Sequence, residues 1–286
     1  MKKNLLSAII LILFYSISIL PQTKGNLVII GGGDKPKYVT QKIIDLAGGK
    51  DAKIIIIPNA SSEPIESGEY NLDEFIKMGC TNVSYLYCNR KEADQDSIIK
   101  KLNGVTGIFF GGGDQAFLTR DLLGTKLLNA IKKIYENGGV ISGTSAGAAV
   151  MSEVMITGNE LKNKDSTYIF ITIERGNVEN TEGFGFLNTV IIDQHFIKRK
   201  RLNRLISMVL EKPDLIGIGI DEETSIVVNP DETFEVLGEN QVMIFNPLNA
   251  LNIKEDSKGN LGVENLKVDI LLSGDKYDLK THSIIK

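Results

Sequence analysis

The sequence predicts an α/β fold in which a mostly parallel β-sheet is covered by helices on both faces. Short runs that are apolar at every position alternate with longer amphipathic segments, which is typical of doubly buried strands connected by helices. Three of these runs end in glycine-rich turns, at residues 31–33, 111–113 and 143–145. In parallel sheets, ligands bind outside the carboxyl ends of the strands. We therefore expect these turns to meet at one functional edge.

Strands and helices alternate regularly through the first two thirds of the chain, with right-handed crossovers expected between the strands. The apolar runs expected to be strands are 27–30, 54–57, 83–87, 107–110, 140–141 and 190–192. The segments between them that favour helices are 38–47, 72–78, 96–102 and 115–135, the last of which Gly124 can interrupt.

From about residue 215 the pattern changes to short strands joined by tight polar turns. These strands are expected at 216–220, 225–229, 233–237 and 241–245, with more around 266–272. Tight turns between consecutive strands are typical of antiparallel hairpins. We therefore expect one α/β domain over residues 23–250 and an antiparallel β extension over residues 251–286.

Composition excludes some classes of protein and partner. The 286 residues are 42% hydrophobic and 24% charged, which suits a globular protein with a substantial core. A formal charge of -4 gives no electrostatic reason to expect a nucleic-acid partner. Cys80 and Cys88 flank the strand expected at 83–87, whose length keeps them apart, so we expect free buried thiols. Neither lies near a histidine, and we expect no metal site and no cofactor.

Residues 1–22 are expected to be a secretory signal outside the folded domain. The basic pair Lys2-Lys3 precedes a mainly apolar run over 5–20, and cleavage is expected within 22–26. The alternative is an uncleaved membrane anchor, for which the run is somewhat short. The signal predicts export to the periplasm or medium, without stable membrane association after cleavage.

The sequence GTSAG at residues 143–147 matches the G-x-S-x-G pattern, in which a serine sits on a tight strand-to-helix turn. A serine hydroxyl becomes a nucleophile only when a base removes its proton and donors stabilise the oxyanion. For Ser145, the N–H of Ala146 and the turn at Gly112 and Gly113 are the candidate oxyanion donors. The alternative is a close helix–strand packing with an inert hydroxyl.

Two histidines are present, and one is a candidate general base. His282 lies in a polar tail near the C-terminus. His195 follows the apolar run 190–192 and precedes an expected helix, which places it at the same kind of strand end as Ser145. The alternative is a hydrogen-bonded structural histidine.

A carboxylate should orient the imidazole of such a base. Asp193 is close in sequence, whereas Asp221, Glu222 and Glu223 follow the strand expected at 216–220. Spacing alone does not separate these four side chains.

The segment after His195 is expected to be a helix rich in basic residues, which are Lys198, Arg199, Lys200, Arg201 and Arg204. Guanidinium groups beside a nucleophile suggest a substrate carboxylate that is held bidentately. The alternative is a solvated basic face.

Four motifs in this order resemble the cyanophycinase family, a group of serine peptidases related to peptidase E. The motifs are GGGDQ at 111–115, SGTSAGAAVM at 142–151, DQHFIKRKRLNRL at 193–205 and GIGIDEETS at 217–225. The resemblance runs from about residue 26 to 246. It implies a flavodoxin-like sheet related to the class I glutamine amidotransferases, with serine where those enzymes carry cysteine.

The resemblance also implies roles for individual residues. Ser145 would be the nucleophile, His195 the general base and Glu222 the carboxylate that orients it. The implied substrate-pocket positions are Gln115, Asp193, Gln194, Arg199, Arg201 and Arg204.

The implied activity is the release of β-Asp-Arg dipeptides from cyanophycin, a poly-aspartate that carries arginine on each side-chain carboxyl. With the expected signal, this makes the chain an exported serine-type exopeptidase. The alternatives are a dipeptidase E-like or isoaspartyl peptidase that acts on small peptides, and a secreted binding protein without catalysis. The sequence leaves a homodimer open.

Overall fold

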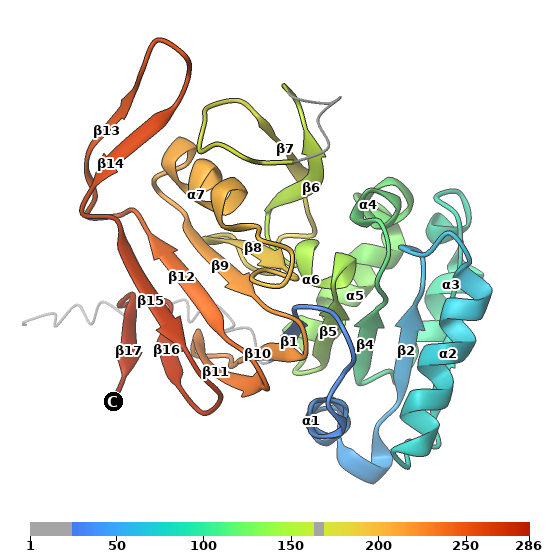
Figure 1. Ribbon diagram of the computed structural model, residues 1–286. Coiled ribbons are helices and arrows are strands. Elements are labelled where there is room, and N and C mark those ends of the chain that lie inside the picture. Colours follow the sequence, from blue (N-terminus) through green and yellow to red (C-terminus); the bar gives the residue numbers. More distant parts are fainter. Residues whose placement is uncertain (1–24, 163–168) are drawn as a thin grey trace, which may run out of the picture.

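The computed structural model describes residues 25–162 and 169–286, and two β-sheets with their helices form the body of the molecule (Figure 1). The expected signal at 1–22 lies outside the described residues. Within the described ranges, no helix has the length and hydrophobicity needed to cross a bilayer.

The larger sheet has nine strands in the order β17-β16-β11-β10-β1-β5-β4-β2-β3. Its parallel part consists of β1 (Asn26–Ile30), β5 (Val140–Thr144), β4 (Gly107–Phe110), β2 (Ile54–Ile57) and β3 (Val83–Tyr85). On the other side of β1 the sheet continues with antiparallel strands, which are β10 (Thr224–Val228), β11 (Thr233–Gly238), β16 (Lys276–Asp278) and β17 (Ser283–Ile285).

Helices cover both faces of the parallel part. One face packs against α1 (Lys37–Leu46) and α2 (Pro64–Lys77), and the other against α4 (Gln115–Leu122), α5 (Lys126–Glu136) and α6 (Ala146–Ala149). The short α3 (Asp96–Ile99) and three 3-10 turns, η1 (Gly49–Asp51), η2 (Glu92–Asp94) and η3 (Lys100–Leu102), complete this half. The strands are apolar at every position because successive side chains enter opposite cores.

The second sheet has four strands in the order β15-β12-β9-β8. The strands are β8 (Val190–Gln194), β9 (Ile216–Ile220), β12 (Val242–Asn246) and β15 (Lys267–Leu271), and β8 and β9 are parallel. One face packs against α7 (Leu202–Glu211), and the other shares the main core with the larger sheet.

The strands expected between residues 216 and 245 do not form one antiparallel unit, which corrects that expectation. Instead β9 and β12 belong to the second sheet, whereas β10 and β11 extend the first. The chain changes sheet at the turn after β9, where Glu223 has a φ of 56° and its N–H bonds to Gly32 O. A strand pattern in the sequence does not reveal this change of sheet.

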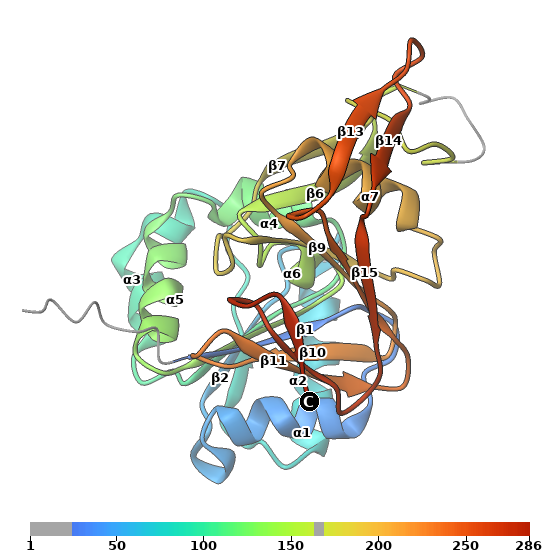
Figure 2. The ribbon, with the colours of Figure 1, turned by 90° about the vertical axis from the view of Figure 1, so that its left-hand side faces the viewer.

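Residues 251–286 contribute strands to both sheets as well as a projecting hairpin. The hairpin consists of β13 (Leu251–Glu255) and β14 (Leu261–Glu264) and extends away from the body (Figure 2). A second hairpin, of β6 (Val154–Glu160) and β7 (Val178–Glu182), was not predicted.

The two cysteines are free and buried, which confirms the expectation. Burial raises the pKa of the Cys88 thiol to about 11.

Candidate active site

The three glycine-rich turns meet at the carboxyl ends of the parallel strands, as expected. Ile30 of β1 lies opposite Thr144 of β5, so Ser145 and the turn at 31–33 leave the sheet at the same edge. The turn after β4 is equally close, because a Cβ on Gly112 would lie 3.5 Å from the Cβ of Ser145.

Ser145 lies in a strained turn between β5 and α6, with φ 54° and ψ -110°. Its N–H donates to Ile30 O at 3.0 Å, which holds the turn against β1. Both flanking glycines are sterically required. A Cβ on Gly143 would lie 2.4 Å from Gly147 O, and one on Gly147 would lie 2.3 Å from Phe110 O. The strand, turn and helix around Ser145 match the structural context of the G-x-S-x-G motif.

Ser145, His195 and Glu222 form a continuous hydrogen-bonded chain. The Oγ of Ser145 lies 2.8 Å from Nε2 of His195, and Nδ1 of His195 lies 2.6 Å from Oε1 of Glu222. Since a carboxylate can only accept, Nδ1 carries the imidazole proton and Nε2 accepts from the serine hydroxyl. The structure therefore places Glu222, of the four candidate carboxylates, on the imidazole.

The imidazole rests on the turn at 31–33. The N–H of His195 donates to Gly31 O at 2.7 Å, and a Cβ on Gly32 would lie 2.2 Å from Cε1 of the ring. Gly32 has a φ of 110°, which favours glycine. Sequence reasoning missed this supporting role, and the glycine triplet after a buried strand was the only signal for it.

Electrostatics favour the neutral imidazole and the charged carboxylate. Burial lowers the pKa of His195, and the nearby positive charges of Arg199 and Arg201 lower it further, although the bond to Glu222 opposes this shift. The hydrogen bond from His195 is the main cause of a lowered pKa for Glu222. The imidazole is thus available as a proton acceptor around neutral pH.

Backbone donors border the serine. Within the described part of the chain, no backbone oxygen accepts from the N–H of Gly112, Gly113 or Ala146, whereas the next N–H along the turn, of Asp114, bonds to Ala60 O. Gly113 has to be glycine, because its φ is 138° and a Cβ there would lie 2.0 Å from Ala60 O.

The basic segment after His195 begins as a loop, which corrects the expected helix. Helix α7 starts only at Leu202, and residues 196–200 form a turn. Positive φ angles at His195 (49°) and Lys200 (53°) interrupt a helical path. The carboxylate of Asp221 accepts from two N–H groups of this turn, so the turn has an alternative to helical hydrogen bonds.

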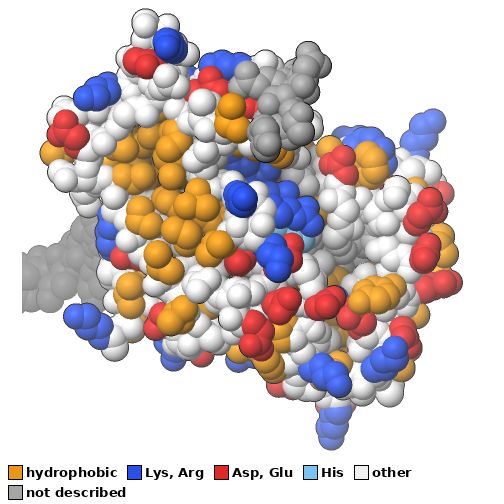
Figure 3. All heavy atoms as spheres, in the orientation of Figure 1, with side chains coloured by type: hydrophobic (Ala, Val, Ile, Leu, Met, Phe, Trp, Pro, Cys, Tyr) orange, Lys and Arg blue, Asp and Glu red, His pale blue; other side chains and the backbone are white. Residues whose placement is uncertain are grey.

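The predicted substrate-binding arginines differ in exposure. Arg199 is exposed, and its Nε lies 3.7 Å from Oε1 of Glu222. Arg201 is partly buried, and its Nη1 donates to the backbone oxygen and to Oε1 of Gln194 at 2.8 and 2.7 Å. Burial lowers the pKa of Arg201 to about 10, with help from the charge of Arg204. Figure 3 shows basic side chains gathered around a histidine on this face.

The other predicted pocket residues are buried and already paired. Arg204 and Asp193 form an ion pair in which both side chains are at most 2% exposed, and the guanidinium lies 5.5 Å from the ring centroid of Phe170. The Nε2 of Gln115 donates to two backbone oxygens of β6, at 2.9 and 2.7 Å. Direct contact of these residues with a substrate stays a prediction.

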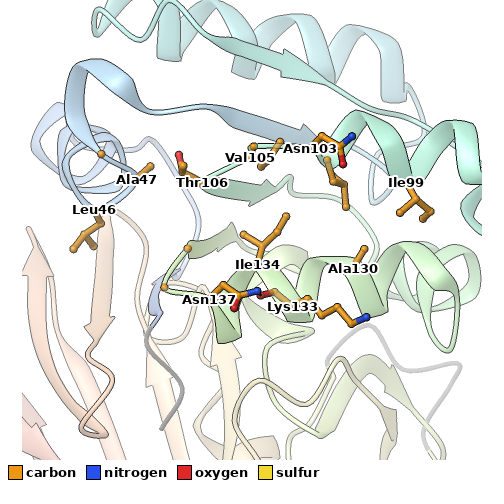
Figure 4. A pocket seen from close by; sticks show the side chains of 15 residues that line it. Leu46, Ala47, Ile99, Asn103, Val105, Thr106, Ala130, Lys133, Ile134 and Asn137 are labelled. Carbon is orange, nitrogen blue, oxygen red and sulfur yellow. The ribbon is translucent and has the colours of Figure 1, made fainter. Parts of the chain in front are cut away.

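Two surface hollows lie at opposite ends of the parallel strands. One, of about 310 Å³, adjoins the turn at 111–113 and is lined by Ser61, Ser62, Glu63, Glu66, Ser67 and Tyr70. The other, of about 480 Å³, includes Thr106 and Gly139, which directly precede β4 and β5. In it, Ala130 and Ile134 of α5 face the segment around Val105 (Figure 4). The larger hollow is therefore remote from Ser145.

The fold and this site define a serine-type peptidase, and comparison with known proteins agrees. The family description "Peptidase family S51" matches residues 27–236, a range that contains Ser145, His195 and Glu222. The chain belongs to peptidase family S51.

Its relatives include cyanophycinases. The chain is 37% identical over 272 residues to a cyanophycinase of Synechococcus elongatus, a match that covers 91% of this chain and 81% of that protein. It is 35% identical over 274 residues to a cyanophycinase of Nostoc sp., covering 93% and 89%. Among solved structures, a peptidase from an acI-B1 Actinobacterium shares the fold, with a TM-score of 0.66, 23% identity and coverage of 91% of this chain and 98% of that one.

Proposed function

We propose that this protein is an exported serine-type exopeptidase that hydrolyses cyanophycin to β-Asp-Arg dipeptides. The observation that carries the proposal is the hydrogen-bonded chain from Ser145 through His195 to Glu222, beside a loop that presents arginines. The cyanophycinase relatives, which match over most of the chain, supply the substrate class.

In the proposed mechanism, the Oγ of Ser145 attacks a backbone carbonyl while Nε2 of His195 takes its proton. The charged Glu222 stabilises the imidazolium. The N–H groups of Ala146, Gly112 and Gly113 stabilise the oxyanion. The imidazolium then protonates the leaving amine, and a water molecule, activated by the same imidazole, hydrolyses the acyl-enzyme.

Charge complementarity supports a zwitterionic substrate. Cyanophycin presents carboxylates and guanidinium groups together. Arg199 and Arg201 can hold carboxylates as bidentate pairs. The hollow that adjoins the turn at 111–113 contains Glu63 and Glu66, which can bind a guanidinium group.

A substrate comparison tests the proposal. We expect wild-type protein to release β-Asp-Arg from insoluble cyanophycin, and to do so faster than it cleaves α-linked Asp-X or simple isoaspartyl dipeptides. Preference for either small peptide would identify a dipeptidase instead. Absence of all three activities, together with no labelling of Ser145 by an activated serine reagent, would favour a binding protein.

Export is part of the proposal and rests on the basic and apolar character of residues 1–22. Expression of the full chain in a bacterium should give a mature protein that starts within residues 22–26 and lies outside the cytoplasm. A protein that keeps Met1 and stays in the membrane fraction would instead show an anchor.

A further inference from the structure

Asp221 directly precedes Glu222, but its carboxylate has a different partner. Its Oδ1 accepts from the N–H of Ile197 at 3.1 Å and from that of Lys198 at 2.9 Å, and the residue is only 6% exposed. In the described ranges, no basic side chain forms an ion pair with it. Among the described residues, the hydrogen bonds of this carboxylate go to main-chain N–H groups at the start of the turn that follows His195.

That turn belongs to a segment that we call the arginine loop, residues 196–201. Its first residue, Phe196, is a fixed anchor, because its ring is fully buried and fills the space that a Cβ on Gly219 would need. Beyond this anchor the loop becomes exposed and carries Arg199 and Arg201. The bonds to Asp221 hold the two residues between the anchor and Arg199.

We propose that Asp221 is a positioning residue that sets substrate affinity by fixing the arginine loop. The inference rests on the proposed function in one respect, which is that Arg199 and Arg201 bind the carboxylates of the substrate. Two consecutive residues at the end of β9 then have separate tasks. Glu222 orients the base, and Asp221 orients the groups that recognise the substrate.

Trypsin sensitivity tests the structural half without any substrate. The arginine loop holds four trypsin sites, Lys198 to Arg201. In Asp221→Ala we expect cleavage in this loop to be about fivefold faster or more, because the loop opens locally. Asp221→Asn keeps an acceptor oxygen but loses the charge, and its arginine loop should resist trypsin as well as that of wild type. Asp231→Ala is the matched control, since Asp231 accepts from an N–H in a remote turn.

Kinetics with cyanophycin test the functional half. For Asp221→Ala we expect KM to rise about tenfold, as for the loss of one arginine contact, with kcat within about twofold of wild type. Labelling of Ser145 by a small uncharged serine reagent should stay unchanged, and Asp221→Asn should restore KM.

Three results would overturn the inference: unchanged trypsin cleavage in Asp221→Ala, a fall in kcat and in Ser145 labelling at constant KM, or an Asp221→Asn variant as defective as Asp221→Ala. The last would assign the effect to charge. If wild type labels at Ser145 but does not cleave cyanophycin, the proposed substrate fails, whereas the trypsin result still decides whether Asp221 holds the loop.

Discussion

Three residues of the site have positive φ angles although none is glycine: Ser145 (54°), His195 (49°) and Glu223 (56°). Such conformations cost about 1–3 kcal/mol each and persist where the surroundings hold them. Here each N–H donates to a different backbone oxygen at the end of β1, those of Ile30, Gly31 and Gly32. The strand end therefore aligns Ser145, His195 and the turn that carries Glu222 through main-chain bonds.

At the scale of single residues, the sequence identifies some side chains of the site and not others. Ser145 follows from its motif and His195 from the scarcity of histidines. Glu222 does not follow from spacing, because three consecutive carboxylates sit in one turn. Glu222 bonds to His195 and Asp221 to the main chain of residues 197–198, and these separate partners appear only in the folded chain.

Gly32→Ala should reduce catalysis strongly while the protein still folds. The new Cβ would lie 2.2 Å from the His195 ring, so the imidazole would have to move away from Ser145. We expect kcat/KM to fall by about 100-fold or more. Gly49→Ala is the control, because Gly49 also has a positive φ but a Cβ there would meet nothing within 4 Å. Equal kinetic effects of the two variants would contradict this account.

The pH dependence of Ser145 labelling should report the state of His195. Because the pKa of His195 is lowered, mainly by burial, labelling should rise with pH to a plateau, with a midpoint below the ordinary histidine value of 6.5. The positive charge of Arg199 contributes to this shift, so Arg199→Gln should move the midpoint to higher pH. Arg175→Gln, which changes an exposed arginine paired with Glu255, should not move it. A midpoint that moves down in Arg199→Gln would refute the assignment.

At the level of elements, the apolar runs predicted the parallel strands well, because their side chains are buried on both faces. The predicted break near Gly124 is confirmed, since Thr125 caps a new helix with its side chain. The arginine loop was mistaken for a helix, because its disruption depends on Asp221, which is distant in sequence. The hairpin of β6 and β7 was missed.

The segment that follows the glycine turn at 31–33 is anchored by a buried lysine. The Nζ of Lys35 lies 2.5 Å from Oε2 of Glu74 in α2 and 5.2 Å from the ring centroid of Phe109 in β4. The lysine side chain is 6% exposed. Lys35 therefore joins the segment after the glycine turn, on which the His195 ring packs, to α2 and to β4.

Glu74→Ala should therefore destabilise the fold, because it leaves the buried Lys35 ammonium without its carboxylate. We expect a loss of about 1–3 kcal/mol in the free energy of unfolding, measured by urea denaturation. Asp73→Ala removes the adjacent carboxylate, whose pair with Lys77 is exposed on both sides, and should have a much smaller effect. Similar losses in the two variants would mean that the Lys35–Glu74 pair contributes no more to the free energy of unfolding than an exposed ion pair.

At the scale of the whole molecule, the site lies where the two sheets meet. Ser145 follows β5 of the larger sheet, whereas His195 and Glu222 follow β8 and β9 of the smaller one. Gln194 at the end of β8 pairs with Ile220 at the end of β9, so His195 and Glu222 leave this sheet side by side. A shared hydrophobic core fixes one sheet against the other. The sequence predicted that glycine-rich turns meet at one edge of a sheet, but not that His195 comes from a second sheet.

The central claim is that Ser145, activated across this junction, hydrolyses the backbone of cyanophycin. The most direct test is the initial rate of β-Asp-Arg release from insoluble cyanophycin by wild type and by Ser145→Ala at equal protein concentration. We predict release by wild type and a loss of about 1,000-fold or more in the variant. Undiminished release by Ser145→Ala would contradict the account.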